Sequence, residues 1–392
     1  YLGPENFGLL SYAISFVGLF FTISTLGLNN IVIRELVKTP RKREEILGTT
    51  FVLKIFGTLL MWLCIAVVLF LIQIDKQSIL LISIIALAAI FQTFNVIELN
   101  YQAEVKAKFI THAQFIEIIV SAIFKLLLIL IGASLVWFAW AYVVNVFILA
   151  IGLLLVYSNK TGTIKKWYWN SNTAKNLLRN SWPMILSGVV ISIYMKIDQV
   201  MIKEMLSAEE VGYYAAAVRL SEAWYFIPMT ITTSLFPAII NARDEGLKAY
   251  SARLNNLYRL MFWMAITIAV PISFTSSFLI NILFGEAYQP AALVLSIHIW
   301  AGIFVFLGVA NGRRLLTENL QKYTMFNTSA GAVINVILNL ILIKKYGITG
   351  AAISTIISYS YAAYFGLSLF NKTRQSFMDI SSIFFGKSLT KI

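Results

Sequence analysis

The chain has 392 residues, of which 59% are hydrophobic and only 12% are charged, and its mean hydropathy is +0.79. Soluble domains are about 45–50% apolar and about 25% charged, so this composition excludes an ordinary soluble fold and indicates an all-α polytopic membrane protein. The net charge of +13 requires no nucleic-acid partner, because the basic residues lie scattered in short segments between apolar runs.

Apolar runs of about 20 residues, long enough to cross a ~30 Å hydrocarbon core, follow one another along the chain. Because the chain starts in a polar turn at Tyr1, we expect that one further helix of the protein precedes it, which would bring the total to twelve. The sequence itself predicts eleven spans, at about residues 9–30, 47–72, 79–100, 113–131, 135–157, 183–203, 212–240, 258–283, 291–311, 324–343 and 350–370.

Basic residues are distributed unevenly between the two sets of connections. One set, which includes residues 34–45 and 158–181, is rich in Lys and Arg, and the opposite set carries only Lys76, Lys203, Lys344 and Lys345. The positive-inside rule therefore places the first set and the C-terminus in the cytoplasm. No outer connection is long enough for a separate domain, so we expect the function to lie among the helices.

A short pattern, Leu-x-x-Glu-x-apolar-Gly, occurs at residues 2–8 and again at residues 206–212. Pro4 suits a first helical turn and Ser207 with Glu210 predicts a capping box, so two unrelated capped turns are one explanation. A parallel repeat of two helix bundles is the other, because a long basic connection separates two hydrophobic halves. On that interpretation we expect an N-terminal bundle at 1–157, a cytoplasmic basic linker at 158–181, a C-terminal bundle at 182–370 and a cytoplasmic tail at 371–392.

Eight ionisable side chains lie within the predicted spans, where a charge costs roughly 2.5–3.5 kcal/mol on insertion scales. Such residues normally face a water-filled cavity or a partner. For Arg219 and Glu222, three residues apart on one helix, simple mutual neutralisation is the alternative. We predict that the basic residues bind an anionic substrate, and that the acidic ones set the electric field or take up a coupling ion: Lys54, Lys125, Lys196 and Arg219, and Glu98, Glu117, Asp198 and Glu222.

Polar residues also recur at helical spacing, as expected for the lining of a cavity. Small and polar side chains hold membrane helices together as well, so a structural role is the alternative for the uncharged ones. The stripes are Gln92, Asn95 and Glu98; Thr50, Lys54 and Thr58; Ser11, Ser15, Thr22 and Asn29; Gln114, Glu117, Ser121 and Lys125; Asn327, Gly331, Asn335 and Asn339; and Ser354, Ser358 and Tyr361.

The sequence gives no sign of a metal site, a cofactor or a catalytic centre. Cys64 is the single cysteine, and His112 and His298 are isolated. No phosphate-binding loop of the type GxxxxGK[ST] occurs. We therefore expect a transporter that uses no cofactor and does not hydrolyse ATP.

Four stretches together resemble the Wzx-type oligosaccharide flippases, a polysaccharide biosynthesis family within the multidrug/oligosaccharidyl-lipid/polysaccharide exporter superfamily. They are residues 2–8 (LGPENFG), 27–35, 198–220 and 346–352 (YGITGAA). The resemblance implies two pseudo-symmetric six-helix bundles arranged as a V, with the family's first helix absent from this chain, and an alternating-access cycle.

The same resemblance implies a cargo and its surroundings. The cargo is an undecaprenyl-pyrophosphate-linked oligosaccharide, such as an O-antigen unit of lipopolysaccharide, moved across the bacterial inner membrane. A proton or sodium gradient would drive the cycle. A polysaccharide polymerase and a chain-length regulator are implied as further partners.

Two other functions stay open at this point. An exporter of cationic drugs from the same superfamily would share the fold, but acids and aromatic residues should then dominate its cavity. A membrane glycan polymerase is the alternative among enzymes. It would need an outward catalytic surface, usually on a sizeable exterior loop, and the sequence offers none.

Overall fold

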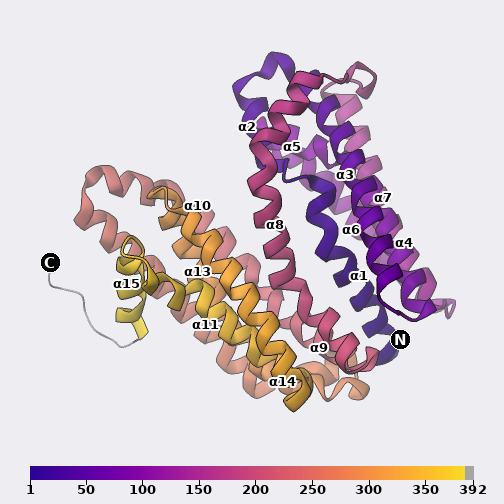
Figure 1. The fold of residues 1–392 in the computed structure, drawn as a ribbon, viewed down its shortest axis with the longest axis vertical. Helices are drawn as coiled ribbons and strands as arrows, with labels where there is room; N and C mark the ends of the chain where they lie inside the picture. Colours follow the sequence, from indigo (N-terminus) through magenta and orange to yellow (C-terminus); the bar gives the residue numbers. More distant parts are fainter. Residues whose placement is uncertain (385–392) are drawn as a thin grey trace. The chain divides into compact units, whose positions relative to one another are not determined.

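The computed structural model describes residues 1–384, and these residues form helices without any β-strand (Figure 1). This confirms the predicted all-α class. The α-helices are α1 (Gly3–Thr25), α2 (Asn29–Lys38), α3 (Arg43–Leu71), α4 (Lys76–Gln92), α5 (Val96–Ala103), α6 (Ala107–Leu130), α7 (Leu135–Lys160), α8 (Ser171–Met205), α9 (Ala208–Glu222), α10 (Phe226–Glu245), α11 (Leu247–Phe284), α12 (Ala291–His298), α13 (Ala301–Thr317), α14 (Gln321–Ala363) and α15 (Arg374–Phe384).

Ten helical stretches within residues 1–384 are long and apolar enough to cross a membrane, which confirms the polytopic prediction. The number is ten and not eleven because the last stretch, Gln321–Leu369, covers the two spans predicted at 324–343 and 350–370. Gly347 separates them inside α14, with φ 60° and ψ −143°. Glycine adopts this left-handed conformation without steric cost, so one residue reverses the chain where a longer loop was expected.

Two of the spans are interrupted by a 3₁₀ turn, at Thr93–Asn95 between α4 and α5 and at Ala223–Tyr225 between α9 and α10. Pro228 accounts for the second break, because its ring clashes with the carbonyl group four residues earlier and it donates no hydrogen bond. Pro237 and Pro271 lie inside continuous helices.

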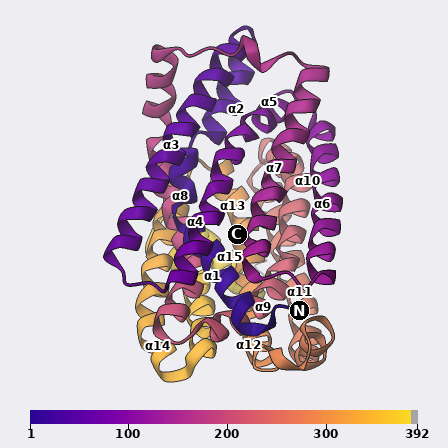
Figure 2. The ribbon, with the colours of Figure 1, turned by 90° about the vertical axis from the view of Figure 1, so that its right-hand side faces the viewer.

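The described chain divides into two compact units. Unit 1 comprises Tyr1–Leu2 and Leu9–Lys196. Its helices α6 and α7 lie side by side, and α4 packs on α7 (Figure 2). A core of Leu28, Val32, Leu47, Tyr101 and Tyr157 holds it together, and this core includes Ala174 and Leu177 at the start of α8.

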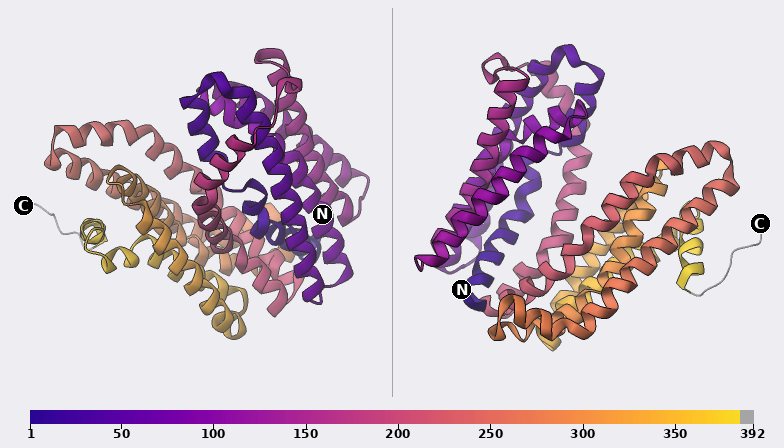
Figure 3. Two further views of the ribbon diagram at one scale, coloured as in Figure 1. Left: turned by 45° about the horizontal axis from the view of Figure 1, so that its top comes forward. Right: turned by 180° about the vertical axis from the view of Figure 1, so that it is seen from behind.

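Unit 2 comprises Gly3–Gly8 and the chain from Ile197 onward. Here α10 and α11 form a long hairpin joined at Gly246 (Figure 3). Tyr258, Met261, Phe306 and Leu307 are almost completely buried and form the centre of its core.

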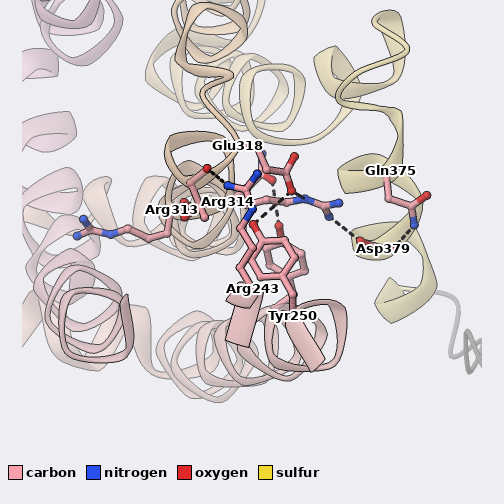
Figure 4. Close-up of polar contacts among 10 residues, drawn as sticks. Arg243, Tyr250, Arg313, Arg314, Glu318, Gln375 and Asp379 are labelled. Carbon is pink, nitrogen blue, oxygen red and sulfur yellow. Dashed lines mark hydrogen bonds and ion pairs between the residues drawn. The ribbon is translucent and has the colours of Figure 1, made fainter. Parts of the chain in front are cut away.

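Helix α15 packs against the other helices of unit 2 through both apolar and charged contacts. Phe377 stacks on Tyr364 with ring centroids 4.7 Å apart. The buried Arg314 of α13 pairs with Asp379 of α15 at 2.6 Å and with Glu318 at 2.9 Å (Figure 4). The first part of the predicted tail is therefore an ordered helix fixed to the bundle, whereas residues 385–392 lie outside the described residues.

Candidate functional site

A polar cavity of about 250 Å³ opens into unit 1 between α1, α2, α3, α4 and α5. Buried side chains line its inner part, and exposed side chains line its mouth. Lys54 and Thr58 of α3 are buried in it, while Asn29, Asn30 and Gln102 are exposed at its edge. The full lining is Phe21, Ser24, Thr25, Asn29, Asn30, Ile33, Lys54, Thr58, Ala89, Gln92, Thr93, Asn95, Glu98, Leu99 and Gln102.

Local breaks in the helices bring these side chains to one place. α1 ends at Thr25, and Leu26 and Gly27 adopt left-handed conformations with φ 49° and 61° before α2 starts at Asn29. The 3₁₀ turn at Thr93–Asn95 sets Glu98 in the first turn of α5, where the positive end of the helix dipole favours a carboxylate.

Lys54 and Glu98, two of the predicted site residues, meet in this cavity. Lys54 is only 3% exposed, and its positive charge attracts the Glu98 carboxylate, although the two described side chains form no direct ion pair. The Oε1 atom of Glu98 is buried and has no hydrogen-bond partner among the described residues. A buried acceptor without a donor is unfavourable, so the Glu98 carboxylate is short of one hydrogen-bond donor.

The stripes on α3 and around the α4–α5 break predicted part of this lining, and the structure unites Gln92, Asn95 and Glu98 with Lys54 and Thr58. Ser24, Thr25, Thr93, Asn30 and Gln102 were missed. For Asn30 the signal was present, because Gly27 ends a helix and two asparagines follow within three residues.

Asp198 forms a second polar cluster, inside unit 2. It is 6% exposed and accepts hydrogen bonds from Tyr214 at 2.8 Å, Thr355 at 2.6 Å and Asn339 at 2.6 Å. Asn339 also donates to Asn335 Oδ1 at 3.1 Å. The Oδ1 atom of Asn339 is buried without a hydrogen-bond partner in the described part of the chain.

Two hydroxyl groups and one carboxamide N–H thus converge on the Asp198 carboxylate, and within residues 1–384 no cation pairs with it. The stripes predicted Asn335 and Asn339. Tyr214 and Thr355 were missed, because neither was assigned to a polar stripe and the sequence does not show that α9 and α14 meet at Asp198.

The other predicted site residues lie outside the cavity lining of unit 1 and the hydrogen-bonded cluster around Asp198. On α6, Lys125 is exposed and Glu117 is half-buried; on α9, Arg219 is exposed and Glu222 is half-buried. The stem of Lys196 lies beside Gly18 of α1, where a Cβ atom would be 3.6 Å from its Cγ.

Comparison with known proteins agrees with the fold and with the predicted class. The family model described as polysaccharide biosynthesis protein matches residues 1–243. The chain is 23% identical over 382 residues to a putative O-antigen transporter of Shigella flexneri, covering 90% of this chain and 87% of the relative. It is 27% identical over 189 residues to a probable low-salt glycan biosynthesis flippase of Haloferax volcanii, covering 48% of this chain and 40% of that protein.

Two solved structures share the fold at 14% sequence identity. One is an inward-facing multidrug resistance transporter of the MATE family, with a TM-score of 0.76 and coverage of 99% of this chain and 93% of that one. The other is the lipid II flippase MurJ in an inward closed conformation, with a TM-score of 0.68 and coverage of 98% and 93%. These two relatives and two solved structures are transporters or flippases by name, and not enzymes, as the sequence predicted.

Proposed function

The chain belongs to the family of polysaccharide biosynthesis proteins, and on that basis we propose that it is a flippase that moves lipid-linked oligosaccharide units across a membrane. The observation that carries the proposal is the cavity of unit 1, in which carboxamides, hydroxyls and the oppositely charged Lys54 and Glu98 line a membrane-spanning bundle. Polar side chains of this kind replace water around the hydroxyl groups of a sugar.

The proposed cargo carries its sugars on undecaprenyl pyrophosphate. Its diphosphate must cross a low-dielectric slab, and positive side chains lower that electrostatic cost. We assign contacts with the diphosphate-sugar headgroup to the four predicted basic residues, Lys54, Lys125, Lys196 and Arg219. Glu98, Glu117 and Glu222 would shape the field around it.

Asp198 is the proposed site of ion coupling. A buried carboxylate surrounded by Asn335, Asn339, Tyr214 and Thr355 offers the oxygen ligands that a hard cation prefers. It can also exchange a proton while its neighbours keep their hydrogen bonds. The unpartnered Oδ1 of Asn339 adds one more acceptor for a cation.

We place the protein in the inner membrane of a bacterium, by analogy with its relative, the putative O-antigen transporter of Shigella flexneri. The basic connections place its C-terminus in the cytoplasm by the positive-inside rule. A polysaccharide polymerase and a chain-length regulator would then use the flipped units. A drug antiporter of the same fold is the second candidate, but acids and aromatic residues should then dominate its cavity, whereas in the cavity of unit 1 Lys54 balances Glu98.

The test is transport by the purified chain in vesicles that contain an undecaprenyl-diphosphate oligosaccharide. A membrane-impermeant lectin outside measures the glycan that has crossed. We expect movement above that of protein-free vesicles, and a loss of rate in Lys54→Gln and Arg219→Gln but not in Lys76→Gln, which removes an exposed charge at the start of α4. Glycan movement equal to that of empty vesicles would contradict the proposal, and uptake of a cationic dye alone would favour the antiporter.

A further inference from the structure

We propose that the cavity of unit 1 is a recognition site for one sugar ring of the lipid-linked glycan, so that it contributes to the choice of cargo. The inference rests on the proposed function, since it assigns the sugar part of that cargo to a particular place. Three properties of the cavity support it: its hydrogen-bonding capacity, its charge balance and its size.

The carboxamides in the lining are free to bind a ligand. Four of them, Asn29, Asn30, Asn95 and Gln102, make no side-chain hydrogen bond with another described residue. Each carboxamide has two N–H donors and an acceptor oxygen. A sugar hydroxyl both donates and accepts, so paired carboxamides match neighbouring hydroxyl groups on a ring.

The hydroxyl groups in the wall present acceptor oxygens to the cavity, because their protons are already used in hydrogen bonds to the backbone. Thr58 donates to Lys54 O at 2.9 Å, Thr93 to Ile90 O at 2.6 Å and Ser24 to Phe21 O at 2.7 Å. Each proton is thereby directed to the residue's own helix, and the oxygen lone pairs are left for donors in the cavity. A polyol supplies such donors, whereas a phosphate group without protons supplies none.

The charges of the lining residues also favour a neutral polyhydroxyl ligand. Lys54 and Glu98 compensate each other, so the cavity as a whole attracts an anion only weakly. The unpartnered Oε1 of Glu98 requires a hydrogen-bond donor and repels a phosphate oxygen. A neutral polyhydroxyl ring avoids this repulsion, and Lys54, which lines the same cavity, can donate to the ring oxygens.

Size limits the occupant. A cavity of about 250 Å³ lies below the roughly 300–1,000 Å³ of pockets for drug-sized ligands. It has room for about one sugar ring. Phe21 supplies an apolar wall against which the C–H face of a ring can pack, as in other pockets that combine aromatic and polar side chains.

The experiment is equilibrium binding to the full chain in nanodiscs with two probes. One is a short-chain prenyl diphosphate that carries a single hexose, tested as its glucosyl, galactosyl and N-acetylglucosaminyl forms. The other is the same prenyl diphosphate without a sugar. We expect at least one sugar-bearing probe to bind about tenfold more tightly than the bare diphosphate.

Substitutions in the cavity then show which residues cause the tighter binding of the sugar-bearing probe. Asn95→Ala and the exposed Gln102→Ala should abolish the preference for the sugar and leave binding of the bare diphosphate unchanged. Asn256→Ala, which removes an exposed carboxamide of α11, should keep the preference. Thermal unfolding of each variant shows whether a loss reflects misfolding, and the exposed position of Gln102 makes its variant the decisive one.

Equal binding of all probes to the natural chain would overturn the inference, and so would a sugar preference that persists in Gln102→Ala. Either result leaves the proposed function intact if vesicles still move the glycolipid. Failure of transport together with a sugar preference lost in Gln102→Ala would instead overturn the flippase proposal and support the sugar site.

Discussion

Gly8 lies directly against the backbone carbonyl group of Ala208, with no room for a side chain between the two residues. The contact is reciprocal, because Gly212 lies in the same way against the carbonyl group of Pro4. Each glycine thus meets the residue four positions before the other glycine. The two copies of the Leu-x-x-Glu-x-apolar-Gly pattern therefore contact each other within unit 2, which explains why both copies end in glycine.

Replacing either glycine should push the starts of α1 and α9 apart. In Gly8→Ala the new Cβ would collide with the carbonyl oxygen of Ala208, and in Gly212→Ala with that of Pro4. Overpacking of this kind costs about 1–3 kcal/mol, so both variants should unfold at lower temperature in detergent. Gly312→Ala is the matched control, because it lies in helix α13 with open space around its Cβ position. Unfolding temperatures of Gly8→Ala and Gly212→Ala at or above that of the natural chain would refute the close contact.

Much of this fold could be predicted from the sequence, because the bilayer imposes a length on each apolar run. The capping box at Ser207 was also predicted, and Ser207 does accept a hydrogen bond from the amide of Glu210 at 3.2 Å. The beginning of α8 was not predicted. It starts at Ser171 and not near residue 183, since its first turns are polar and hydropathy detects only the apolar part of a helix. The family resemblance is confirmed by the match over residues 1–243.

The ion pair between Arg314 and Asp379 should be essential to the docking of α15. Both side chains are buried, at 8% and 5% exposure. Removing one partner of a buried pair costs about 3–5 kcal/mol, because the other charge is left uncompensated. Arg314→Met leaves the Asp379 carboxylate without its counter-charge and should lower the unfolding temperature strongly, and the double variant should recover part of that loss. Asp379→Leu should lower it less, because Arg314 keeps its pair with Glu318. Single variants as stable as the natural chain would show that the pair does not hold α15 in place.

Only part of the candidate site could be predicted from the sequence, because the sequence does not show which helices meet. Helical spacing revealed that Gln92, Asn95 and Glu98 share a face, but it cannot reveal which other helix that face meets. The partners Tyr214 and Thr355 of Asp198 come from α9 and α14. Such long-range contacts are set by packing and leave no periodic signal in the sequence.

Lys54 and Glu98 should behave as a coupled pair. Lys54→Met leaves the Glu98 carboxylate without a counter-charge, so we expect transport of the glycolipid to fall at least about tenfold, which corresponds to ~1.4 kcal/mol. Glu98→Gln should also reduce transport, and the double variant should lose less than the two single effects combined. Transport rates in vesicles at equal protein content measure all three. Strictly additive losses would indicate that the two side chains act independently.

Asp198→Asn should uncouple transport from the ion gradient without disturbing the fold. Asparagine has nearly the same shape as aspartate, so packing against Tyr214, Thr355 and Asn339 is preserved, but the negative charge that attracts a cation or takes up a proton is lost. We expect the natural chain to respond to an imposed proton or sodium gradient, whereas Asp198→Asn should transport at one low rate in both gradients. Asp244→Asn, which neutralises an exposed acid on α10, is the control and should keep the response. If Asp198→Asn still accelerates when the gradient is imposed, the coupling ion must bind elsewhere, and the cluster around Asp198 would then be a structural link between α8, α9 and α14.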